Sequence, residues 1–95
     1  MDDKQKDILI RNMVYNLPTL RKRLDMTQAE LAAKIGFGRS SLTAIENKKR
    51  SMTWNTFLSL ILIFTKNNET DKLLNVMEIY TDELNDYIKN NSGKE

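Results

Sequence analysis

One stretch of the chain combines an arginine, small hydroxyl side chains and a run of basic residues. Arg39-Ser40-Ser41 opens a short predicted helix, Thr43 and Ala44 follow one turn later, and Asn47-Lys48-Lys49-Arg50 comes directly after it. A guanidinium group can donate two parallel hydrogen bonds to guanine, and serine or threonine hydroxyls can bond several base edges. Lysine and arginine neutralise phosphates. This set of side chains is therefore suited to contacting a nucleic acid.

The segment 28–47, which contains these side chains, has the spacing of two short helices joined by a tight turn. Thr27 and Glu30 fit a capping box, in which each side chain bonds the backbone N–H of the other residue. We expect Gly36 to supply the left-handed turn that ends the first helix. A second helix follows over residues 39–47, so the segment predicts a helix-turn-helix. Its core side should carry Leu31, Ala32, Ile35, Phe37, Leu42 and Ile45.

The formal net charge of +2 is distributed unevenly along the 95 residues. Residues 20–50 carry eight basic and three acidic side chains, whereas residues 67–95 carry three basic and seven acidic ones. A basic middle followed by an acidic end predicts a polyanion at one face and another partner at the other.

Composition argues against several other classes of protein. The chain has no histidine and no cysteine, which disfavours zinc sites, disulfide scaffolds, thiol nucleophiles and imidazole catalysis. We therefore expect neither an enzyme nor a bound cofactor, metal or small-molecule substrate. The first residues lack the layout of a signal peptide, and the longest apolar run, 57–64, is too short to span a bilayer. We expect a small cytoplasmic protein that does not bind membranes.

The remaining elements are also predicted to be helical, because glycine and proline are scarce and β-branched alternation is nearly absent. Expected helices cover residues 3–15, 18–24, 54–65 and 69–89, with Thr53 as the cap of the apolar helix 54–65. Propensity alone would also allow a strand at 60–64. A frayed tail is expected at residues 90–95.

The motif residues together resemble the lambda-repressor-like (Xre-like) helix-turn-helix transcriptional regulators. The resemblance covers about residues 17–64 and is carried by Leu20-Arg21, Met26 to Gly36, Arg39-Ser40-Ser41 and Ile45-Glu46-Asn47. It implies an all-α fold: a five-helix DNA-binding domain whose third helix lies in the major groove. Here that domain would have an extra N-terminal helix and an extended C-terminal amphipathic helix.

The resemblance also implies a role for individual residues. Base edges would be contacted by Arg39, Ser40, Thr43 and Ala44, with Ser41 at the margin. Phosphates would be contacted by Gln28, Asn47, Lys48, Lys49 and Arg50, and Gln28 would also brace the recognition helix. Arg21 and Glu46 would form a structural ion pair.

Two positions depart from the family pattern. Gly38 replaces the usual serine or threonine cap of the recognition helix and is a weaker cap. Lys48 replaces the glycine that often follows Ile-Glu-Asn, which predicts a different way of ending that helix and an additional phosphate contact.

We divide the chain into an N-terminal helical extension (1–15), the helix-turn-helix domain (16–66) and a C-terminal amphipathic helix with a frayed tail (67–95). A stripe at helical spacing, together with the apolar helix before it, predicts a surface for a second copy or another partner. Its members are Ile61, Phe64, Leu73, Met77, Tyr80, Leu84 and Tyr87.

These features predict a sequence-specific regulator that binds double-stranded DNA. We expect a repressor that acts as a homodimer on a pseudo-palindromic operator. An alternative is an antitoxin that binds DNA through the same core and a basic toxin through the acidic C-terminal helix. A third interpretation is an adaptor domain that uses the same fold without binding DNA.

Overall fold

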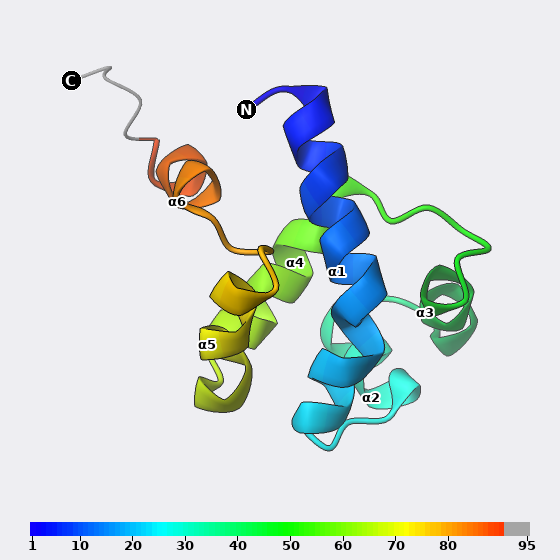
Figure 1. Cartoon of the computed structure of the whole chain (residues 1–95). Coiled ribbons are helices and arrows are strands. Elements are labelled where there is room, and N and C mark those ends of the chain that lie inside the picture. Colours follow the sequence, from blue (N-terminus) through cyan, green and yellow to red (C-terminus); the bar gives the residue numbers. More distant parts are fainter. Residues whose placement is uncertain (91–95) are drawn as a thin grey trace.

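The computed structural model describes residues 1–90, which form helices and their connections without any strand (Figure 1). The expected all-α fold is therefore confirmed, and the strand alternative at 60–64 is wrong. None of the helices in this part of the chain is long and apolar enough to cross a membrane. The helices are α1 (Asp3–Arg23), α2 (Gln28–Lys34), α3 (Arg39–Glu46), α4 (Trp54–Thr65), α5 (Asn68–Val76) and α6 (Asp82–Lys89).

The N-terminal residues do not form a separate helix, because α1 runs without interruption through Pro18. Proline in a helix interior removes one backbone hydrogen bond and costs about 3 kcal/mol. The cost is opposed by burial of a stripe that continues on both sides of the proline. The stripe consists of Leu9, Met13, Leu17 and Leu20, each at most 5% exposed. The two separate helices expected over 3–15 and 18–24 are thus wrong, since one buried face joins both halves of α1.

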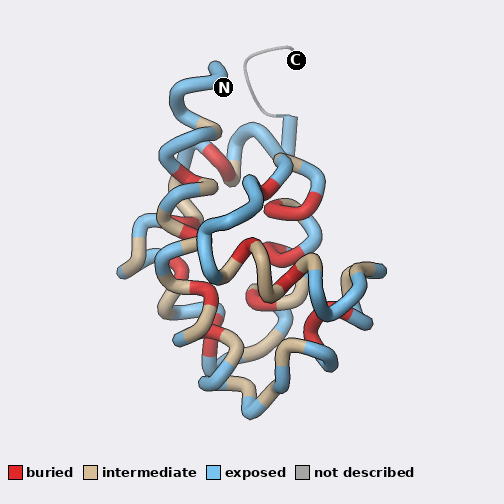
Figure 2. Tube along the Cα trace, turned by 90° about the vertical axis from the view of Figure 1, so that its right-hand side faces the viewer, coloured by how far each residue is buried: buried red, intermediate tan, exposed pale blue. Residues whose placement is uncertain are grey.

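Helix α4 packs against α1 on one side and α5 on the other, which explains its apolar sequence. Phe57, Leu60 and Phe64 are fully buried, and Thr53 caps the helix through a hydrogen bond from the Thr56 N–H (3.2 Å). Buried stretches of several helices meet in the interior of the molecule (Figure 2). The expected bounds and cap of this helix are confirmed.

The single helix expected over 69–89 is divided into α5 and α6, which is a correction to the prediction. Glu78 adopts a left-handed conformation (φ 57°), and Ile79, fully buried, donates its N–H to the Leu74 carbonyl oxygen (2.8 Å). Thr81 then caps α6 by accepting a hydrogen bond from the Leu84 N–H (3.2 Å). Burial of Ile79 and Leu84 therefore overrides the continuous helical period. Apart from Asn90, the expected frayed tail lies outside the described residues.

Four helices end in the same way, with a left-handed residue followed by a residue whose N–H bonds back to the last turn. The left-handed residues are Asp25, Gly36, Lys48 and Glu78. Only one of the four is glycine, the residue type that adopts this conformation without a steric penalty from Cβ. The N–H donors that follow them are Met26, Phe37, Lys49 and Ile79, which bond Arg21, Ala32, Ala44 and Leu74 respectively.

Lys48 therefore ends α3 in the conformation that glycine would take, with φ at 62°. The backbone N–H of Lys48 bonds the Ile45 carbonyl oxygen (3.0 Å), and that of Lys49 bonds the Ala44 carbonyl oxygen (2.8 Å). The expectation of a different helix stop is wrong, because backbone hydrogen bonds and not residue type fix this turn.

A hydrogen-bonded network connects α1, α2 and α3. Arg21 contacts Glu46 through Nε–Oε2 (2.9 Å) and Nη2–Oε1 (3.1 Å), so the expected ion pair is present and is bidentate. Gln28 Nε2 donates to Glu46 Oε1 (2.9 Å), and Thr43 Oγ1 donates to Gln28 Oε1 (2.6 Å). Arg21 Nη1 also donates to the Met26 carbonyl oxygen (3.0 Å). The network fixes α3 relative to the other two helices.

The start of α2 follows the predicted capping box. The Glu30 N–H donates to Thr27 Oγ1 (3.0 Å), and the Thr27 N–H donates to Glu30 Oε1 (2.8 Å). The second hydrogen bond, from the Thr27 backbone, is the main reason that the pKa of the Glu30 carboxyl lies below its usual value. This cap places Gln28 in the first turn of α2, from which it reaches Glu46.

The left-handed conformation of Lys48 gives a direct stability test. Lys48→Gly should raise the free energy of unfolding by about 1 kcal/mol, because glycine has no Cβ to penalise positive φ. The measurement is the midpoint of urea unfolding. Lys48→Ala is the matched control, since it removes the amine but retains the strain. A Lys48→Gly protein no more stable than Lys48→Ala would contradict this account.

The ion pair predicts a different pattern. Glu46→Ala should lower the free energy of unfolding by roughly 3 kcal/mol, because the largely buried Arg21 guanidinium loses its counter-charge. The double variant Arg21→Met, Glu46→Leu should recover most of this loss, since neither remaining side chain is charged. Urea titrations of the three proteins test both statements. A double variant as unstable as Glu46→Ala would show that an unpaired charge is not the cause.

Candidate nucleic-acid interface

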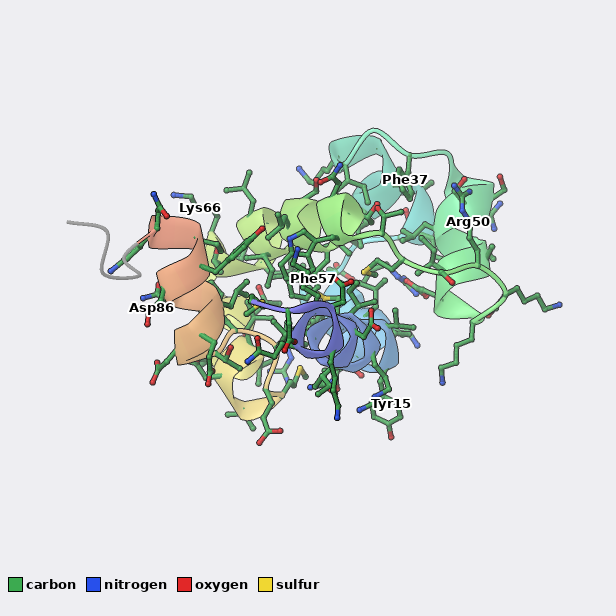
Figure 3. The ribbon with its side chains drawn as sticks, turned by 90° about the horizontal axis from the view of Figure 1, so that it is seen from above. Tyr15, Phe37, Arg50, Phe57, Lys66 and Asp86 are labelled. Carbon is green, nitrogen blue, oxygen red and sulfur yellow. The ribbon has the colours of Figure 1, made fainter. Side chains whose placement is uncertain are left out.

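Helix α3 lies at one edge of the molecule and presents one face to solvent (Figure 3). Leu42 and Ile45 anchor the opposite face, because both are at most 1% exposed in the shared core. Gly38 is the N-cap of this helix and, because it has no side chain, forms no side-chain capping hydrogen bond, which agrees with the weaker cap that the sequence predicts. Along the solvent face, a hollow is lined by Arg39, Ser40, Thr43, Ala44, Asn47 and Lys49. The structure thus brings together four of the five expected base-contacting residues and two of the expected phosphate-contacting residues.

Arg39 lies between two hollows. It lines the one along α3, and it also lines a second one beside Arg21, Thr27, Gln28 and Ala29 at the start of α2. Within residues 1–90, its side chain forms neither a hydrogen bond nor an ion pair. The guanidinium group is exposed and retains all of its donors for an external acceptor.

Gln28 and Thr43 are held by the network described above, which limits what each can offer. The Thr43 hydroxyl hydrogen is directed at Gln28 Oε1, so the methyl group and the oxygen lone pairs remain available. One of the two Gln28 amide hydrogens is directed at Glu46 Oε1, and the other is not used by this bond. Gln28 therefore braces α3, the structural half of its expected role.

Besides Gln28, which lines the second hollow, three of the expected contact residues do not line the hollow along α3. Ser41 is half-buried and accepts a hydrogen bond from Arg50 Nη1 (2.8 Å), while the Arg50 guanidinium lies 5.9 Å from the Phe37 ring centroid. Lys48 Nζ lies 5.6 Å from the ring centroid of Tyr15 on α1. These basic side chains flank the hollow and rest on aromatic rings, an arrangement in which a cation is attracted to the ring face.

Sequence reasoning missed the two rings that position these cations. Tyr15 is 74% exposed, and Phe37 is half-buried in the turn between α2 and α3. Tyr15 does not belong to the buried stripe of α1, so its position outside that stripe was an available signal. Its contact with Lys48 could not be predicted, because it depends on how α1 and α3 pack.

The predicted partner stripe is largely internal to the chain, which corrects its assignment as a surface. Phe64 and Leu84 are fully buried, so they cannot contact a second chain in this fold, and Ile61 is only 4% exposed. Leu73, Met77 and Tyr80 are half-buried and packed against the core, and only Tyr87 (41% exposed) is open to solvent. The helical spacing of the stripe thus identified mainly positions that are covered by other helices of the same chain.

The described part of the chain contains no group of three or more aspartate or glutamate side chains placed to hold a metal ion. The candidate interface consists of hydrogen-bond donors, cations and small side chains on α3 and its flanks. Such a surface offers hydrogen bonds and positive charge to an acidic polymer.

The comparison with known protein families matches residues 19–53 to the helix-turn-helix family. These residues include the last part of α1, all of α2 and α3, and the connection to α4. No curated protein and no solved structure matches the chain. The matched residues include the hydrogen-bonded network and the exposed face of α3. Residues 19–53 are thus a helix-turn-helix of the lambda-repressor-like (Xre-like) family, a DNA-binding element of transcription regulators.

Proposed function

We propose that this protein is a sequence-specific repressor that inserts α3 into the major groove of duplex DNA as one half of a homodimer. The observation that carries the proposal is the exposed face of α3, on which Arg39 is free beside Ser40, Thr43 and Ala44. These side chains lie on one face and are backed by the network to α1 and α2. Small side chains allow the helix backbone to approach base edges, and Arg39 supplies the bidentate donor.

Sequence discrimination would rest mainly on Arg39. A bidentate contact to guanine O6 and N7 contributes about 1–3 kcal/mol of discrimination against other bases. Thr43 would offer its methyl group to thymine, since its hydroxyl hydrogen already bonds Gln28. Ser40 and Ala44 would line the rest of the contact, with Ser41 at its margin because Arg50 bonds its hydroxyl.

Affinity would come mainly from phosphate contacts on both sides of α3. Lys49 and Asn47 border the base-reading residues, and the unused Gln28 amide hydrogen points to a phosphate contact at the start of α2. Lys48 and Arg50 would reach further phosphates by leaving the rings of Tyr15 and Phe37. A cation–π contact at an exposed site contributes only about 0.5–1 kcal/mol. Each cation that contacts a phosphate releases counterions, so binding should weaken as salt rises.

A second candidate function is that of an antitoxin that binds DNA through the same helix-turn-helix and a basic toxin through its C-terminal helices. The specific observation in its favour is charge: residues 67–90 carry six acidic and two basic side chains. In both candidates α3 binds DNA, and they differ in the partner of α5 and α6.

The main test compares Arg39→Ala with Lys49→Ala by titration of a selected operator and a scrambled duplex. Arg39→Ala should weaken binding to the operator by about 1–3 kcal/mol, because discrimination at one base position is lost. Its binding to the scrambled duplex should change little. Lys49→Ala, the matched control, should weaken binding to both duplexes equally and reduce the salt slope by about 1. Unchanged sequence preference in Arg39→Ala would refute the assignment of Arg39 to base reading.

The dimer is tested separately by measuring the mass of the protein–DNA complex. Two copies should bind a pseudo-palindromic duplex whose half-sites lie about 34 Å apart, with one α3 in each half-site. Moving the half-sites by about half a helical turn should abolish binding of the second copy, because its α3 would face the wrong side of the duplex. A single copy per pseudo-palindromic duplex at saturation would exclude the homodimer.

A further inference from the structure

An apolar groove lies between α4, α5 and α6 and encloses about 610 Å³. Leu58, Ile61, Leu62 and Ile88 supply its apolar surface, and Asp71 and Asp82 are also among its lining residues. Leu62 is 60% exposed and Ile88 is 47% exposed, although each belongs to a helix with a buried face. Exposed apolar side chains that gather at a groove with polar surroundings are typical of a surface that binds a partner.

The charge around the groove specifies the chemistry of its occupant. The two aspartates belong to a segment, residues 67–90, in which acidic side chains outnumber basic ones by six to two. A complementary partner would therefore combine apolar side chains for the groove with lysine or arginine around them. An amphipathic helix provides this arrangement, because its apolar side chains recur on one face at steps of three and four residues.

A second copy of this chain fits the groove less well. A symmetric contact between two grooves would bring two acidic segments together, and like charges at an interface are unfavourable. A contact between this groove and the basic helix-turn-helix of another copy would cover α3 and produce an open chain of molecules. Neither arrangement provides a basic partner while keeping α3 available.

We infer that the groove between α4, α5 and α6 binds a basic amphipathic helix of a protein partner. The inference rests on the partner-binding alternative proposed above and specifies the surface and the chemistry of the partner. Helices α3 and α6 lie at opposite ends of the molecule, with Arg50 beside α3 and Asp86 on α6 (Figures 1 and 3). A helix in the groove would therefore leave the proposed DNA-contacting face uncovered.

The single tryptophan provides a signal close to the groove. Trp54 stacks on Phe57 (centroids 4.8 Å apart) and contacts the edge of Tyr87 (5.9 Å). Tyr87 precedes Ile88 in α6, and Leu58 lies one turn after Trp54 in α4. Because α4 and α6 both contribute to the groove, a helix bound there should alter the environment and fluorescence of Trp54.

The experiment titrates the full chain with a synthetic helical peptide of about 18 residues that contains leucine on one face and lysine elsewhere. The control peptide replaces every lysine with glutamate. The lysine peptide should change Trp54 fluorescence and bind with a micromolar Kd, and the glutamate peptide should not bind. Equal binding of the two peptides would overturn the charge argument.

Two pairs of variants locate the binding surface. Leu62→Lys should weaken binding of the lysine peptide at least about tenfold, as should Ile88→Lys. Val76→Lys is the matched control, because Val76 is 79% exposed on α5 and does not line the groove. The variant Asp71→Asn, Asp82→Asn should also weaken binding, whereas Glu83→Gln, Asp86→Asn changes the net charge equally outside the groove. Equal effects within either pair would overturn the inference.

Mass measurement and DNA titration complete the test. A wild-type chain that is dimeric without peptide, and that becomes monomeric in Leu62→Lys, would show that a second copy occupies the groove and would overturn the inference. DNA binding by Leu62→Lys should match that of the wild type. A wild-type chain that does not bind DNA would refute the proposed regulator but would leave the peptide result unchanged. Failure of the proposed regulator can therefore be distinguished from failure of the groove inference.

Discussion

The contact between Arg21 and Glu46 determines how the DNA-binding element is assembled. Two guanidinium nitrogens meet two carboxylate oxygens at 2.9 and 3.1 Å, and both side chains are mostly buried. Because a buried carboxylate needs further donors, Glu46 also accepts the Gln28 amide, and Gln28 in turn accepts the Thr43 hydroxyl. One charge pair therefore fixes the tilt of α3 and the rotamers of two residues proposed to contact DNA.

The network has a chemical consequence for the interface. Groups used to hold α3 in place are not available to a ligand, so Gln28 and Thr43 offer fewer donors than their residue types suggest. Arg39 forms no such contact within residues 1–90 and keeps its full donor set. The interface thus separates positioning from recognition, with fixed residues beside one free arginine. Preorganised neighbours reduce the side-chain entropy lost when a complex forms.

Segregated charge gives the two ends of the molecule different surfaces. Three basic residues, Lys48, Lys49 and Arg50, follow α3 directly, whereas six acidic residues lie on α5, α6 and their connection. The groove between α4, α5 and α6 adds apolar surface to the acidic end. Separation matters physically because charges further apart than about 8 Å are largely screened at physiological ionic strength. DNA at one end and a basic helix at the other would therefore compete little through electrostatics.

The sequence alone determined the features that depend on local interactions. The capping box at Thr27 and Glu30, the turn at Gly36, the cap at Thr53 and the exposed face of α3 could be predicted, because each involves residues within about one or two helical turns. The sequence also predicted Arg21–Glu46, through resemblance to a family. Only the tertiary structure decided that α1 continues through Pro18, that Glu78 divides α5 from α6, and that Phe64 and Leu84 are buried. These outcomes depend on which helices pack together, and burial of apolar side chains between them outweighs local preferences of a few kcal/mol.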